Sequence, residues 1–274
     1  MELIVFDLDG TLLNKASEIS DFTRDTLGLL RKRDIAFTVA TGRTMHGAIK
    51  PMAGHDFTLP QIYKNGVMIW HPEKESYSHK YMLTKTELQT TLNSFAEQNV
   101  TPFIFTLDEN NQHAAYHPPI QTDADARLIE ELSVNRGLPL NPVSELPEDA
   151  QITNISALGP FDAVETIAAQ VETQDHLVVY RGGGIQASNN THWMDIHHSE
   201  GSKGAAVLQL KKHLGASNVV CFGDSDNDLS MFETADEAYA PENGLAEVKA
   251  VATGVIGHHD EDGIAHFLRE RFSL

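Results

Sequence analysis

The chain is poor in cysteine and in positive charge. Of its 274 residues only Cys221 is a cysteine, so no disulfide can form within one chain, and its apolar neighbours in NVVCFGD indicate a small buried side chain. Lysine and arginine number 20 against 39 aspartates and glutamates, a formal net charge of −19. Such a charge repels polyanions, so we expect neither a nucleic acid nor a membrane as partner, and an anionic ligand would need local positive charge.

Long hydrophobic runs are also missing. No apolar stretch approaches the ~20 residues of a membrane span, and the first residues, MELIVFDLDG, lack the basic start and apolar core of a secretory signal. We therefore expect a cytoplasmic protein, as a monomer or a homodimer. The length of 274 residues favours two domains, although one large α/β unit would also fit.

Both ends of the chain alternate between strand and helix patterns. The predicted strands are 2–8, 35–43 and 218–224, and the predicted helices are 17–33, 44–54, 202–215 and 261–272. Continuously apolar strands are typical of a parallel sheet that helices cover on both faces. We therefore predict a doubly wound, Rossmann-like α/β core formed by residues 1–81 and 199–274.

The middle of the chain has a different pattern. Asn65-Gly66 between apolar runs indicates a hairpin whose turn residues need positive φ. Beyond it, the predicted helices are 86–98, 123–136 and 161–172, and the predicted strands are 101–107, 113–117, 152–158, 176–181 and 192–197. We predict that residues 82–198 form a separate α+β cap domain inserted into the core.

Three core strands end in polar residues, at the edge where open parallel sheets bind ligands. Asp7 and Asp9 lie at the end of the first strand, Thr41-Gly42-Arg43 at the end of the second, and GDSDND (223–228) at the end of the third. Without a cation such acids would repel one another by several kcal/mol, whereas a hard divalent ion would turn the repulsion into binding. Mg²⁺ is favoured because it needs only one or two carboxylates and accepts phosphate oxygens as further ligands.

The identity of the ion and a lysine near the predicted site both indicate which ligand would bind. Ca²⁺ is the competing ion, but in DSDNDLSMFETA the EF-hand positions for Gly and for a bidentate Glu hold Leu229 and Ala235. Lys203 stands at the start of a predicted helix, where a cation opposes the helix dipole. A ligand anion explains it better than the alternative of a solvated surface lysine.

Together, DLDGTLL, TGR, a lysine ahead of a helix and GDSDND resemble the four motifs of the haloacid dehalogenase-like phosphatase superfamily, in the same order. The position and size of the insert are similar to the Cof-type branch, class IIB, which has an α/β cap between the second and third motifs. The resemblance implies a Mg²⁺-dependent phosphatase that acts through an aspartyl-phosphate. A large cap that closes on the cleft would limit it to small phosphorylated metabolites, such as sugar phosphates or nucleotide-related monophosphates.

The resemblance also implies a role for each site residue. Asp7 is the nucleophile and Asp9 the general acid and base, and alternation along an extended chain would point both side chains the same way. The implied metal ligands are Asp7, the main-chain carbonyl of Asp9, and Asp224, while Asp228 orients Lys203 or a metal-bound water. The implied contacts to phosphate or substrate are Thr41, Gly42, Arg43, Lys203 and Asn227.

Other interpretations stay open. A phosphomutase or phosphotransferase would use the same Asp7 nucleophile with another acceptor, and a non-catalytic phosphometabolite-binding protein would keep the fold.

GGGIQA (182–187) matches the Gly-x-Gly-x-x-Ala dinucleotide fingerprint, but no helix pattern follows, which favours a cap hairpin. The adjacent histidines 197–198 and 258–259 would point to opposite faces of a strand, so we expect no shared metal there.

Overall fold

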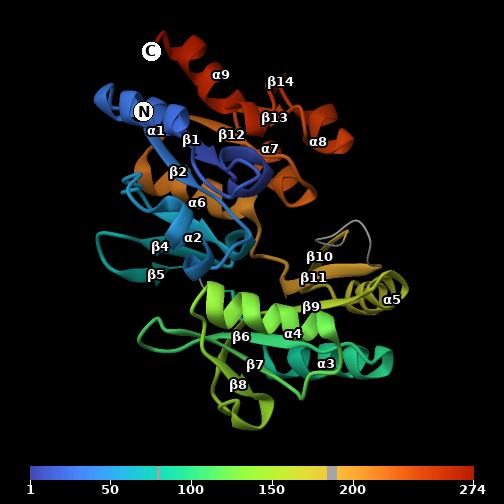
Figure 1. Ribbon diagram of the computed structural model, residues 1–274. Coiled ribbons are helices and arrows are strands. Elements are labelled where there is room, and N and C mark those ends of the chain that lie inside the picture. Colours follow the sequence, from blue (N-terminus) through green and yellow to red (C-terminus); the bar gives the residue numbers. More distant parts are fainter. Residues whose placement is uncertain (79–80, 184–189) are drawn as a thin grey trace. The chain divides into compact units, whose positions relative to one another are not determined.

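Figure 1 shows the chain as a computed structural model that describes residues 1–78, 81–183 and 190–274. The chain divides into two compact units: Met1–His79 with Gly201–Leu274, and Lys80–Glu200. The first unit thus ends at residue 79, where we predicted 81, and resumes at 201, where we predicted 199.

The first unit is built on a five-stranded sheet in the order β14-β13-β12-β1-β2. Its strands are β1 (Glu2–Phe6), β2 (Ala36–Val39), β12 (Asn218–Phe222), β13 (Glu237–Pro241) and β14 (Gly254–Ile256). All neighbouring pairs are parallel, which confirms the predicted parallel core sheet. Because Phe6 lies in register with both Phe222 and Val39, β1, β12 and β2 end together at one edge.

Helices cover both faces of this sheet. The helices of this unit are α1 (Asp21–Lys32), α2 (Met45–Met52), α6 (Lys203–Leu214), α7 (Leu229–Thr234), α8 (Ala246–Val251) and α9 (Gly263–Phe272). On one face Val5 and Cys221 join the buried cluster that includes Leu210 of α6, which confirms that the cysteine is buried. On the other face the ring of Phe222 lies 5.8 Å from that of Phe267 in α9. Alternate side chains of each strand therefore enter two separate cores.

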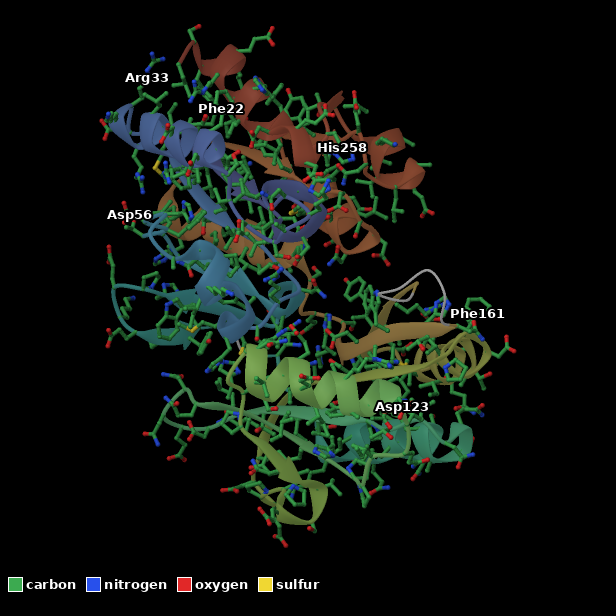
Figure 2. The ribbon with its side chains drawn as sticks, in the orientation of Figure 1. Phe22, Arg33, Asp56, Asp123, Phe161 and His258 are labelled. Carbon is green, nitrogen blue, oxygen red and sulfur yellow. The ribbon has the colours of Figure 1, made fainter. Side chains whose placement is uncertain are left out.

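Serine residues cap the N-termini of α1 and α6, and an arginine–phenylalanine contact joins α1 to α9. The side chains of Ser20 and Ser202 accept the backbone N–H of the third helical residue in α1 and α6, respectively. Phe22 of α1, labelled in Figure 2, lies 3.9 Å beneath the guanidinium of Arg269, so α1 packs against α9.

A small antiparallel sheet follows β2 in the same unit. Its strands are β3 (Gln61–Tyr63), β4 (Met68–His71) and β5 (Ser76–Ser78). The connection between β3 and β4 contains Asn65 and Gly66 with φ of 54° and 98°, which confirms the predicted hairpin with positive φ. A Cβ on Gly66 would lie 2.1 Å from the carbonyl oxygen of Ser202, so the turn packs directly against the start of α6.

The second unit holds a six-stranded mixed sheet in the order β10-β11-β9-β6-β7-β8. Its strands are β6 (Phe103–Leu107), β7 (His113–His117), β8 (Leu140–Pro142), β9 (Gln151–Pro160), β10 (Leu177–Gly182) and β11 (Thr191–His198), and its helices are α3 (Lys85–Gln98), α4 (Asp123–Glu130) and α5 (Phe161–Val171). The predicted α+β pattern is confirmed. Only β7 and β8 pair in parallel among the strands of this sheet that the structure describes.

The fingerprint at 182–187 falls mostly outside the described residues, which resume at 190. His197 and His198 do lie in a strand, but His258 and His259 do not, because His258 caps the short 3-10 turn His259–Glu261. The prediction of opposite strand faces was wrong there, and the two rings lie 4.9 Å apart. Within the ranges described, no helix has the length and apolar character to cross a membrane.

Candidate active site

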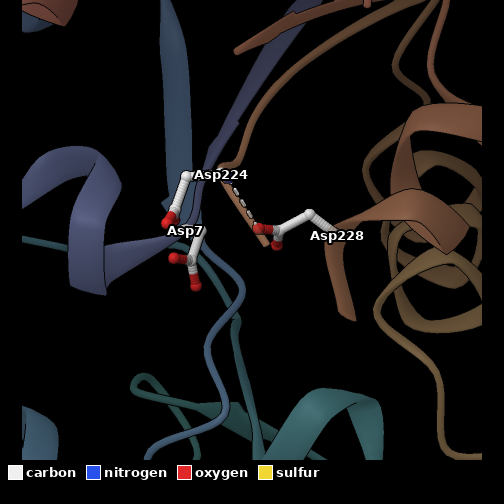
Figure 3. A group of neighbouring side chains, drawn as sticks. All are labelled: Asp7, Asp224 and Asp228. Atoms are coloured by element: carbon white, nitrogen blue, oxygen red, sulfur yellow. Dashed lines mark hydrogen bonds between the residues drawn. The ribbon is translucent and has the colours of Figure 1, made fainter. Parts of the chain in front are cut away.

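Three carboxylates meet at the edge where β1 and β12 end. Asp7 follows β1 and its backbone N–H donates to the carbonyl of Phe222 over 2.9 Å, which joins the two strand ends. Asp224 and Asp228 come from the loop between β12 and α7. Figure 3 shows the three side chains close together, and one oxygen from each lies within 4.8 Å of the others.

A buried lysine binds this group of acids. The Nζ of Lys203, the first residue of α6, donates to Asp7 Oδ1 and to Asp228 Oδ1, each over 2.6 Å. The side chain of Lys203 is 0% exposed. Burial acts to lower the pKa of Lys203, but the charges of Asp228 and Asp7 outweigh it and hold the pKa above its usual range. Lys203 is therefore buried among the acids and is not a surface lysine, while its contact to phosphate stays a prediction.

Despite this lysine, the pKa values of Asp7 and Asp224 are raised. Burial raises the pKa of Asp7 well above its usual range, and Asp228 and Asp224 add to the rise while Lys203 opposes it. Burial and the neighbouring Asp228 raise the pKa of Asp224 to about 6. Three carboxylates against one ammonium give −3 + 1 = −2 when all are ionised. A divalent cation would balance that charge.

The donor set fits Mg²⁺. Asp7 and Asp224 offer carboxylate oxygens, the hard ligands that Mg²⁺ prefers, and one or two of these are enough. Asp228 is already engaged, because its Oδ2 accepts the backbone N–H groups of Asp224 and Ser225 over 2.8 and 3.0 Å and its Oδ1 accepts Lys203. The geometry thus gives Asp228 an orienting contact to Lys203 and leaves Asp7 and Asp224 as the candidate ligands.

Gly10 lets the chain turn beside Asp224. Its φ is 72°, and a Cβ there would lie 2.4 Å from Asp224 Oδ2. Thr11 donates its hydroxyl to the other oxygen, Oδ1, over 2.8 Å. The loop after β1 therefore determines how the Asp224 carboxylate is oriented.

We expect Gly10→Ala to weaken Mg²⁺ binding and to destabilise the fold by at least about 1–2 kcal/mol, since an L-residue in this conformation costs that much before any clash with Asp224. Urea unfolding and a Mg²⁺ titration measure the two effects. The matched control is Gly28→Ala in α1, where a Cβ would meet only the end of Arg31 at 3.9 Å. That change should stabilise the helix by about 0.5–1 kcal/mol. Equal behaviour of the two variants would contradict the role of Gly10.

Residues 41–43 form a loop and not the end of a strand. Strand β2 stops at Val39, short of the predicted residue 43, because the chain leaves the sheet to meet the β3–β4 hairpin. There Asn65 N–H donates to the carbonyl of Thr41, and Arg43 N–H donates to the Thr41 hydroxyl over 3.1 Å. The hairpin therefore holds Thr41 in place at the site edge, where the side chain is buried.

Gly42 and Asn227 meet at the same hairpin. A Cβ on Gly42 would approach Asn65 Oδ1 to 3.0 Å. Asn227, from the 3-10 turn Asp226–Asp228, donates its side-chain N–H to the same oxygen over 2.9 Å. Asn65 thus links the two loops to which we assigned phosphate contacts.

Asp9 lies apart from the buried cluster. Strand β1 ends at Phe6, and the backbone is extended at Asp7 (φ −68°, ψ 161°) and again at Asp9 (φ −73°, ψ 128°), within the turn Leu8–Leu12. The side chain is 55% exposed and forms an ion pair with Arg43 over 2.5 Å. The sequence predicted a contact from Arg43 to phosphate or substrate, and not this pairing with Asp9.

Two residues near the site, Asn243 and His259, were not predicted from the sequence. Asn243 donates its side-chain N–H to the carbonyl of Gly10 over 2.7 Å, and His259 Nδ1 lies 2.7 Å from the carbonyl of Leu13. Both lie outside the four motifs and brace the loop that follows Asp7. Nothing in their local sequence indicates this, because each contact joins residues more than 200 positions apart.

Comparisons with known proteins show the family of the chain. The family model for the haloacid dehalogenase-like hydrolases matches residues 4–268. The chain is 26% identical to 5-amino-6-(5-phospho-D-ribitylamino)uracil phosphatase YitU of Bacillus subtilis, over 99% of this chain and 98% of that protein. It is 26% identical to pyridoxal phosphate phosphatase YbhA of Escherichia coli, over 97% of each. The solved structure of the HAD subclass IIB sugar phosphatase BT4131 superposes with a TM-score of 0.78 at 17% identity, over 100% and 99% of the two chains.

Proposed function

The chain belongs to the haloacid dehalogenase-like hydrolases and is a phosphatase of that family, and from this premise we propose that it hydrolyses small phosphorylated metabolites with Mg²⁺ and through an aspartyl-phosphate. The observation that supports this most is the buried Lys203 bonded to both Asp7 and Asp228, with Asp224 beside them. The relatives named above act on a phosphorylated ribitylaminouracil and on pyridoxal phosphate, both small phosphate esters. Sugar phosphates and nucleotide-related monophosphates are the substrates to test first.

Asp7 and Asp9 divide the chemistry between them. Lys203 holds Asp7 Oδ1, and Oδ2 is the oxygen that attacks phosphorus. The Oδ2–P bond forms while the bond from phosphorus to the leaving oxygen breaks, and Asp9 gives that oxygen a proton. Asp9 then takes a proton from water, the water oxygen bonds to phosphorus, and the Oδ2–P bond breaks. The cycle releases an alcohol and inorganic phosphate and restores both carboxyl groups.

The remaining residues bind and orient the phosphoryl group. Lys203 neutralises charge on its oxygens, which is the main requirement of phosphoryl transfer. The Thr41 hydroxyl already accepts Arg43 N–H and can donate its own proton to a phosphate oxygen, beside Gly42 and Asn227. Asp7, Asp224 and the carbonyl of Asp9 would hold Mg²⁺. When bound, Mg²⁺ supplies a second positive charge that neutralises the transferred group.

The test is product analysis on a panel of phosphate monoesters with Mg²⁺ present. We expect inorganic phosphate that carries one oxygen from ¹⁸O-labelled water, and loss of turnover when a chelator removes the metal. A phosphoryl group found on another metabolite would instead identify a phosphomutase or phosphotransferase. Tight binding of the same esters without turnover would indicate a binding protein.

We expect Mg²⁺ to raise the melting temperature more at pH 7 than at pH 5. The pKa of Asp224 is raised to about 6, so protons compete with the metal for this carboxylate as the pH falls through 6. Below that value the affinity should fall about tenfold per pH unit for one displaced proton. Without metal, the folded state binds this proton more tightly than the unfolded chain, so the stability contributed by Asp224 falls as the pH rises through 6.

Thermal unfolding at both pH values, with and without Mg²⁺, measures this effect. Asp224→Asn is the comparison variant and should lose most of the Mg²⁺-induced shift. A shift of equal size at pH 5 and pH 7 would contradict the assignment of Asp224 as a ligand.

A further inference from the structure

The guanidinium of Arg43 holds the carboxylate of Asp9 at both oxygens. Nε donates to Oδ2 over 2.6 Å and Nη2 donates to Oδ1 over 2.5 Å, a two-point contact that fixes the plane of the carboxylate. The third nitrogen, Nη1, donates to the carbonyl of Gly47 in α2 over 2.7 Å. Arg43 therefore connects Asp9 to a helix of the core.

The backbone of Arg43 is held as well. Its N–H donates to Thr41 Oγ1, and its carbonyl accepts the N–H of Lys64 from the hairpin over 3.0 Å. The side chain of Arg43 is 20% exposed, whereas that of Asp9 is 55% exposed. The more buried and better anchored partner thus orients the more exposed one, which would otherwise sample several rotamers.

This contact is compatible with proton transfer by Asp9. A carboxylate has about four lone-pair sites, and two parallel N–H donors occupy one on each oxygen. The other two sites face away from the guanidinium and can carry a proton to or from a reacting oxygen. Lysine could not replace arginine here, because an ammonium lacks the planar pair of donors.

We propose that Arg43 is a positioning residue for Asp9, which keeps the carboxyl group aimed for proton transfer to the leaving oxygen. This inference rests on the proposed function, in which Asp9 is the general acid. It differs from the sequence prediction for Arg43, a direct contact to phosphate or substrate. The two roles predict different dependence on the leaving group.

The experiment compares kcat/KM for two probes, p-nitrophenyl phosphate and an alkyl phosphate that the wild-type protein turns over. Nitrophenolate leaves with little help from an acid, whereas an alkoxide needs a proton. General acid catalysis contributes about 10²–10⁴-fold, so we expect Arg43→Met to lower kcat/KM about 100-fold for the alkyl ester and less than about fivefold for the aryl ester. Arg43→Lys should recover less than about a tenth of the lost alkyl activity. Losses of equal size on both esters would overturn the inference and favour a phosphate contact.

Asp9→Asn, measured in parallel, separates this inference from the proposed function. If Asp9→Asn lowers kcat/KM by the same factor for both esters, Asp9 is not the general acid. If Asp9→Asn affects the alkyl ester selectively and Arg43→Met does not, only the positioning role fails. For the alkyl ester, kcat/KM of the double variant Asp9→Asn/Arg43→Met should lie within about twofold of that of Asp9→Asn, because the two changes act on one step. If the two single losses multiply in the double variant, the inference is contradicted.

The matched control is Arg24→Met. Arg24 lies on α1 and forms an ion pair with Asp21 over 2.7 Å, so the same substitution removes an arginine from an exposed aspartate elsewhere. We expect unchanged kcat/KM for both probes. Melting curves of all variants exclude unfolding as the cause of a loss.

Discussion

Asp7→Asn is expected to lower the rate of phosphate release by at least about 10³-fold, because an amide cannot form the acyl-phosphate bond. The shape of the side chain is kept, so substrate can still enter. Phosphate release under Mg²⁺, with mass spectrometry to exclude deamidation back to aspartate, is the measurement. More than a few per cent of residual activity would refute the assignment of Asp7 as nucleophile.

The same variant should remain folded. The raised pKa of Asp7 means that its surroundings disfavour the charged form relative to the neutral one. A neutral amide of the same size removes one of the three crowded carboxylates and leaves Asp228 bonded to Lys203. We therefore expect a melting temperature in the absence of metal equal to or above that of the wild type. The control, Asp25→Asn on the exposed side of α1, should change neither rate nor stability.

The sequence predicted the buried part of this site because strand order decides it. Asp7 and Asp224 follow apolar strands, and parallel neighbours bring their ends to the same edge of the sheet. Lys203 could be placed because it begins a helix against the dipole preference. In both cases secondary structure alone fixes the position of the side chain.

The rest of the site depends on loop contacts that have no sequence pattern. Asp9 pairs with Arg43, a residue of the loop after β2, and that strand ended earlier than predicted. The contacts from Asn243 and His259 require the C-terminal segment to return to the loop after β1. Strand β8 was not among the predicted strands, because its proline-containing sequence is typical of a loop. It forms a strand by pairing with β7, which its own sequence does not indicate.

Lys203→Met should destabilise the metal-free protein by about 3–5 kcal/mol, the cost of leaving a buried charge without its partner. The change removes the cation from between Asp7 and Asp228, which are both buried. It should also abolish turnover, because the phosphoryl oxygens lose a neutralising charge. Urea unfolding in the presence of a chelator measures the stability loss.

Helix α6 provides its own control for this result. Lys211 forms an ion pair with Asp236 over 2.7 Å, but the two side chains are 27% and 39% exposed. Solvent screens such a pair, so Lys211→Met should cost less than about 1 kcal/mol and leave turnover unchanged. Adding Asp228→Asn to Lys203→Met should recover part of the lost stability, because it removes one of the two stranded charges, but none of the activity. Equal destabilisation by the two lysine variants would mean that Lys203 is not held between buried carboxylates, and the proposed arrangement of charges around the phosphoryl group would fail with it.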